Sequence, residues 1–212
     1  MASIFNINSP MMRMLSNLWE WIALNLLTVL FSLPIVTIGA ATTAMYYCVG
    51  KQRRGEDDVL KDFWHAFKAN FWQSTAMWLI FVIIGWVLGI SLYSCFTFSS
   101  PGFKMIAYID IGVIALFLMV TSWSFALLSR FKNTVRETIR NAFICVLSNF
   151  WRSLMMAFVN ALPTLLFFLL GPQIVIYLVA IWYAMAANYN MWLIRKPFKH
   201  LEESSEYYNV SQ

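Results

Sequence analysis

Of the 212 residues, 60% are hydrophobic and only 12% are charged, and the mean hydropathy is +0.65. A soluble domain carries about 25% charged residues, so this composition excludes an ordinary water-facing surface. The formal net charge is +5, but the basic residues stand beside apolar runs, as topology and anionic lipid both favour, and we expect no nucleic acid partner.

Four stretches without Asp, Glu, Lys or Arg dominate the chain. They cover residues 21–50, 69–103, 111–129 and 153–194. A helix needs about 20 apolar residues to cross the hydrocarbon core, whereas barrel strands alternate over about 10 residues, which these stretches do not. The sequence therefore predicts an all-α, polytopic transmembrane helical bundle that forms one integral membrane domain over residues 1–212.

The first apolar region, residues 14–50, leaves two interpretations open. One long helix kinked at Pro34 would give five crossings and an external N-terminus. A hairpin with an external break at residues 32–34 and a second helix from Thr37, which would cap it, to about Gln52 would give six crossings. Arg13 has no acidic neighbour, which favours the hairpin and a cytoplasmic N-terminus.

One pattern then occurs twice, 79 positions apart. Asn-Phe-Trp-x-Ser occupies residues 70–74 and again residues 149–153, and an amphipathic stretch precedes each copy, from residues 60 and 139. We expect each stretch to be an elbow helix at the cytoplasmic surface that turns the chain back into the bilayer. The sequence does not decide whether these helices contact lipid or a protein partner. In either case the expected contact residues are Phe63, Trp64, Phe67, Phe71, Phe143, Val146, Leu147 and Phe150.

The repeat divides the chain into two similar halves, at about residues 35–98 and 105–170, followed by an extra final helix at 173–194. Basic residues cluster after the first, third and last apolar regions, while the turns at 97–103 and 171–172 carry no charge. By the positive-inside rule the clusters are cytoplasmic and the bare turns external, which puts the C-terminus in the cytoplasm. The expected crossings after the first region are residues 74–98, 105–129, 152–170 and 173–194.

Polar residues at membrane depth are the remaining candidates for chemistry. Asn25, Asn160 and Asn188, with Asn190 nearby, would either line a polar cavity for a ligand or hydrogen-bond neighbouring helices. The sequence has no P-loop and no His-Glu-x-x-His, and its three cysteines have no paired spacing. We therefore expect no catalytic residues, no metal, no cofactor and no enzymatic activity.

Several runs resemble a known family. Asn25-Leu26-Leu27, the run Leu-Pro-Ile-Val-Thr-Ile-Gly at 33–39, Arg-Gly-Glu at 54–56 and residues 62–73 are similar to the YesL-like family of bacterial integral membrane proteins, a domain of unknown function. The resemblance covers almost the whole chain and is most specific over residues 25–73. Where that family often has Gly-Pro, this chain has Gly39-Ala40.

Members of that family are commonly encoded beside carbohydrate importers of the ABC type. The resemblance thus implies an accessory subunit in the bacterial plasma membrane, packed against the permease or the ATPase through its transmembrane and amphipathic helices. The alternative is a self-contained small-molecule transporter or channel, alone or as a homodimer.

Overall fold

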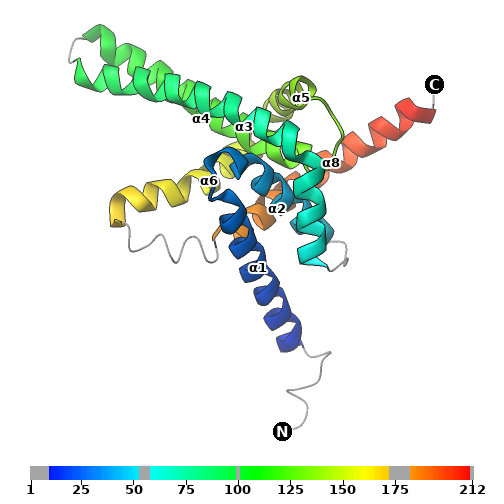
Figure 1. Cartoon of the computed structure of the whole chain (residues 1–212). Coiled ribbons are helices and arrows are strands. Elements are labelled where there is room, and N and C mark those ends of the chain that lie inside the picture. The colour runs from blue at the N-terminus through cyan, green and yellow to red at the C-terminus, as the bar shows by residue number, and fades with distance from the viewer. Residues whose placement is uncertain (1–9, 53–57, 99–100, 172–181, 211–212) are drawn as a thin grey trace.

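The computed structural model describes residues 10–52, 58–98, 101–171 and 182–210, and the regular elements in these ranges are all helices, so the expected all-α class is confirmed. Figure 1 shows α3 and α4 side by side, projecting together from the centre, while α1, α6 and α8 leave it in other directions. The elements are α1 (Pro10–Ser32), η1 (Ile35–Thr37), α2 (Ile38–Gln52), α3 (Val59–Thr97), α4 (Pro101–Leu128), α5 (Val135–Ser148), α6 (Phe150–Leu170) and α8 (Tyr183–Val210).

The first apolar region is a pair of helices and not one long kinked helix. Proline lacks a backbone N–H and clashes with the preceding turn, and α1 ends at Ser32, two residues before Pro34. Thr37 does not cap α2 as expected. Its hydroxyl donates backward instead, to the carbonyls of Phe31 (2.6 Å) and Pro34 (2.8 Å), and so holds the turn closed.

Small residues let α2 lie directly against α3. A Cβ built on Gly39 would stand 2.4 Å from the carbonyl oxygen of Ser74 and 2.6 Å from Cβ of Trp78, so no larger residue fits without a shift of backbone. Ala40 and Ala44, on the same helix, are fully buried. The short side chains of the run at 39–44 are therefore what sets the spacing of the two helices.

The two copies of the repeat differ in their backbone. In the second copy, α5 and α6 meet at Asn149 with a bend of 113°. In the first copy no separate helix forms, because α3 runs without a break from Val59 to Thr97. Its ribbon nevertheless changes direction after the first few turns, where the cyan part in Figure 1 gives way to the segment beside α4. The position of either segment relative to a bilayer stays a prediction.

Two of the described helices, α3 and α4, are long and apolar enough to cross a membrane, and the bent pair α5–α6 would be a third. The ends of α4 lie within four residues of the expected crossing at 105–129. α3 ends one residue from the expected 98, but it begins at Val59 and not near residue 74. Part of the last expected crossing, residues 172–181, lies outside the described ranges. Large apolar side chains such as Trp86 (69% exposed) face outward along α3, which indicates a membrane-embedded protein.

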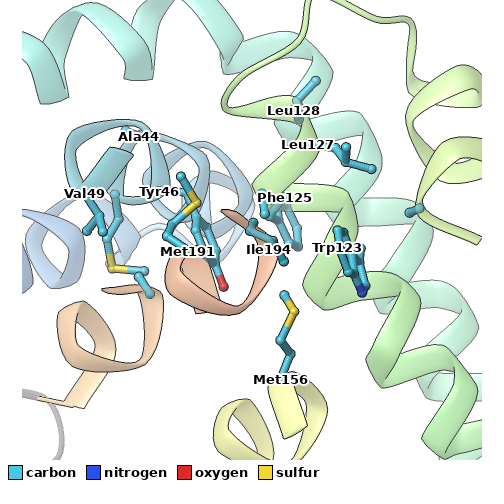
Figure 2. Close-up of a cluster of buried hydrophobic side chains, with 14 of the residues drawn as sticks. Ala44, Tyr46, Val49, Trp123, Phe125, Leu127, Leu128, Met156, Met191 and Ile194 are labelled. Atoms are coloured by element: carbon cyan, nitrogen blue, oxygen red, sulfur yellow. The ribbon is translucent and has the colours of Figure 1, made fainter. Parts of the chain in front are cut away.

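The buried core lies where the two halves meet. Figure 2 shows Tyr46 of α2 and Met191 of α8 on one side and Trp123 of α4 and Met156 of α6 on the other. Trp123 and Met156 are fully buried, and Ile194 of α8 packs in the same cluster. Helices from both halves of the repeat, together with the final helix, thus share one core.

Candidate functional site

A chain of polar side chains crosses this core, one from each of four helices. The Nδ2 group of Asn190 (α8) donates to the hydroxyl of Tyr46 (α2) at 2.8 Å and to Oδ1 of Asn160 (α6) at 2.9 Å. Nδ2 of Asn160 donates in turn to Oγ of Ser122 (α4) at 2.8 Å. We call Tyr46, Asn190, Asn160 and Ser122 the polar seam.

The polar seam is almost satisfied internally. Asn190 is completely buried and Tyr46 and Ser122 nearly so, whereas Asn160 is exposed at the edge. Oδ1 of Asn190 accepts no hydrogen bond from the described residues. A buried acceptor without a donor is costly, so this atom is the one point in the seam where a further hydroxyl, amine or water would be stabilised.

The expected cavity residues do not form one group. Asn160 belongs to the seam, but Asn25 bonds elsewhere: its Oδ1 accepts from the backbone N–H of Ala184 at 2.8 Å, which fastens α1 to the start of α8. Asn188 is half-buried and lies two residues from Asn190, so its side chain leaves α8 in another direction. The central residue, Asn190, has a partner 144 positions away, a distance over which no pattern in one sequence gives a pairing.

Pro163 explains a further contact across the core. Because proline has no N–H, the carbonyl of Val159 loses its normal partner four residues later in α6. The indole Nε1 of Trp182 donates to that carbonyl at 3.3 Å. The proline thus frees an acceptor on α6 that Trp182, the residue before α8, uses.

The asparagine of the repeated Asn-Phe-Trp-x-Ser motif makes the same hydrogen bond in both copies. Asn70 donates to the carbonyl of Ala66, and Asn149 to that of Cys145, each four residues back. The final serine of each copy is fully buried and bonds the helix that precedes the copy, as a donor in the first and as an acceptor in the second. Oγ of Ser74 donates to Oγ1 of Thr43 (3.0 Å), and Oγ of Ser153 accepts from Nε1 of Trp123 (2.8 Å). The motif therefore fastens each surface segment to the helix that enters it.

The surface residues of the first copy are largely covered by the chain itself. Phe31 of α1 packs on Phe63, Trp64 and Phe67 with ring centroids 5.0–5.6 Å apart. Phe63 and Phe67 are 1% and 8% exposed, so α1 occupies part of the face that was expected to meet lipid or a partner, while Trp64 stays 45% exposed. Phe71 is half-buried against Phe67. The amphipathic pattern predicted the apolar face of this segment but not the helix that packs on it.

The second copy presents an apolar outer face. Val146 is buried, but Phe143, Leu147 and Phe150 are 43%, 63% and 52% exposed, and Ile144 between them is 51% exposed. At the matching positions of the first copy, 79 residues earlier, Ile144 corresponds to His65 and Leu147 to Lys68. We call Phe143, Ile144 and Leu147 of α5, together with Phe150 at the start of α6, the α5 face.

Charged groups gather at one end of the α1–α2 pair. Nζ of Lys51 is 2.9 Å from a carboxylate oxygen of Asp62, and the side chain of Gln52 donates to the carboxylate of Glu20. Away from this end, the carboxylate of Asp110 on α4 accepts from Oγ of Ser91 on α3 at 2.5 Å. Among the described residues no three His, Cys, Asp or Glu side chains lie together as metal ligands would.

The comparisons with known proteins are limited to one family. A family model described as "Protein of unknown function, DUF624" matches residues 21–92. This range contains α1 from Trp21 onward, all of α2 and most of α3. No curated protein and no solved structure matches the chain.

Proposed function

We propose that this chain is an accessory membrane subunit of an ABC-type carbohydrate importer in the bacterial plasma membrane. The resemblance to the YesL-like family supports the choice of partner. The packed polar seam, in which most groups are satisfied by one another, supports a structural and not a conducting interior. The sequence has no P-loop, so the energy for transport would come from the partner ATPase.

The observation that carries the proposal is the α5 face. Exposed aromatic and aliphatic side chains on a surface helix, beside basic residues such as Arg140, are typical of a contact with protein or lipid. In the first copy α1 covers Phe63 and Phe67. The apolar side chains that stay exposed there, Leu60 and Trp64, stand beside the exposed His65 and Lys68, so that surface is mixed and not continuously apolar. We therefore assign the contact with the permease or its ATPase to α5 and not to the start of α3.

Affinity purification tests the proposal. The tagged chain, extracted in a mild detergent that keeps importers whole, is expected to bring a permease and an ATPase with it. A Leu147→Lys variant is expected to lose most of that yield, whereas Leu60→Lys, at an equally exposed leucine on the first segment, is expected to keep it. Lysine is the residue that the first copy has at the position of Leu147, which argues against a folding defect.

Two results would count against this function. The chain could elute alone under conditions in which importer complexes survive. Alternatively, both leucine variants could lose the partner equally, which would remove the special role of the α5 face.

A second function is a self-contained transporter or channel, and the unpartnered Oδ1 of Asn190 is the observation that favours it. In that case the seam would open from the exposed side at Asn160. Purified protein in vesicles would then pass small polar solutes, and Asn190→Leu would abolish the flux. Vesicles that stay as tight as protein-free ones would exclude this function.

In both cases the chain is a multi-pass protein with a cytoplasmic C-terminus, on the grounds of its charge distribution. The expected count of five to six crossings includes the region of α1 and α2.

A further inference from the structure

The turn between α1 and α2 exposes apolar side chains. Leu33 and Ile35 are each 71% exposed and Val36 is 50% exposed, and these residues with Pro34 form the end of the hairpin. A turn that emerges into water normally carries Gly, Asn, Asp or Ser. We call residues 33–36 the hairpin tip.

Three backbone groups of the hairpin tip are hydrogen-bonded within the protein. The N–H of Leu33 donates to the carbonyl of Leu30 (3.4 Å), and the carbonyl of Pro34 accepts from both the N–H and the hydroxyl of Thr37. The carbonyl of Ile35 accepts from Nε1 of Trp78 on α3 at 2.9 Å. Irregular backbone at membrane depth is tolerated only when its polar groups are paired in this way, whereas a turn in water would not need it.

Measured from its charged end, the hairpin is too short to reach the far side, and α2 has only 15 residues. Glu20 and Gln52 bond each other at its charged end, and about 14 residues separate Glu20 from Pro34. At 1.5 Å per residue this is about 21 Å, against a hydrocarbon core of about 30 Å.

The candidate span α3 gives an independent measure. It continues for 19 residues beyond Trp78 to its end at Thr97, which is about 28 Å. The far end of the α3–α4 pair therefore stands well beyond the hairpin tip, even if α3 is tilted.

We propose that the α1–α2 hairpin is re-entrant: its tip lies among lipid acyl chains, and residue 52 returns to the side from which α1 entered. The lipid contact is made by the side chains of Leu33, Ile35 and Val36, while Thr37 and Trp78 seal the backbone. The hairpin then adds no crossing, in place of the external break at residues 32–34 that the sequence suggested.

Cysteine labelling tests the depth of the tip. Cys48, Cys95 and Cys145, all buried, are first replaced by alanine. Single cysteines are then introduced as Ile35→Cys, Phe98→Cys and Lys61→Cys, with Leu33→Cys as a second tip variant in case the first does not fold. Each variant is treated with a membrane-impermeant maleimide on intact cells, after permeabilisation, and after denaturation in SDS.

The expected result is that Phe98→Cys, at the end of α3, and Lys61→Cys label from opposite sides. The tip variants are expected to label at least tenfold more slowly than both until SDS is added. An apolar carbene reagent dissolved in the bilayer is expected to modify the tryptic peptide that carries residues 33–36.

Labelling of a tip variant on intact cells at the rate of Phe98→Cys would overturn the proposal in favour of a full crossing. Labelling after permeabilisation at the rate of Lys61→Cys would overturn it in favour of a tip in cytoplasmic water. If the whole chain is inserted in the opposite sense, the two controls exchange roles and the comparison with the tip is unchanged.

Discussion

Replacing Gly39 with alanine adds one methyl group at the closest approach of α2 and α3. The added carbon would lie 2.4 Å from the carbonyl oxygen of Ser74 and 2.6 Å from Cβ of Trp78, well inside normal contact distances. Neither atom is the free end of a flexible side chain, so the two helices must separate. Overpacking of this kind costs about 1–3 kcal/mol.

The matched control is Gly89→Ala on the exposed side of α3, where an added Cβ meets nothing within 4 Å. There alanine is expected to be neutral or to stabilise the helix by up to about 1 kcal/mol. The measurement is the temperature at which half of the protein is lost from its monomer peak after heating in mild detergent. In proteins of this size about 2–4 °C corresponds to each kcal/mol. If Gly39→Ala melts at or above the temperature of Gly89→Ala, α2 and α3 do not pack as described.

Three further predictions follow from the hydrogen bonds. Ser153→Ala is expected to destabilise the protein by about 1–3 kcal/mol in the same melting assay, because the buried indole N–H of Trp123 loses its acceptor. Ser74→Ala is expected to cost only about 0.6 kcal/mol, because the hydroxyl of Thr43 keeps its bond to the carbonyl of Gly39. Equal losses of stability would contradict this. Trp182→Phe is expected to lower stability by about 1 kcal/mol in the wild-type background and by clearly less in the Pro163→Ala background. The reason is that alanine restores the helix hydrogen bond to the carbonyl of Val159. Additive effects in the double-mutant cycle would refute the contact. The backbone hydrogen bond from Thr134, the N-cap of α5, holds the pKa of Glu137 below its ordinary 4.5. The stability that this carboxylate gives to the start of α5 is therefore complete above pH 4.5 and is lost as pH falls through the lowered pKa. Amide exchange at the start of α5 should accelerate over that range, and Glu137→Gln should remove the pH dependence.

Helix positions follow in part from composition, because uncharged runs and proline leave few alternatives. The chain breaks at Pro34, and α4 ends at Leu128, next to the end of the uncharged run at 129. By contrast, α3 begins at Val59, ten residues before its uncharged run starts at residue 69. The repeat could also be recognised in the sequence, but the different backbone conformations of its two copies could not. Asn70 and Asn149 occupy matching positions and donate to matching carbonyls, but only the second interrupts its helix.

Which groups cover or pair with one another could not be taken from the sequence. The period of three to four residues identified Phe63 and Phe67 as one face, and a ring about 30 positions earlier, Phe31, turned out to cover it. In the same way the asparagines indicated polar groups at membrane depth, but the hydrogen-bond partners of Asn190 depend on how four helices come together. Local patterns fix the face of a helix, and tertiary packing fixes what stands opposite.

The unlike outer surfaces of the two copies have a consequence for stoichiometry. A perfectly duplicated chain would offer two equivalent landing places and could recruit two ligand proteins, or one in either of two orientations. Here His65 and Lys68 stand where the other copy has Ile144 and Leu147. Under the proposed function, a protein that recognises the aliphatic version would dock once per chain, in a single orientation.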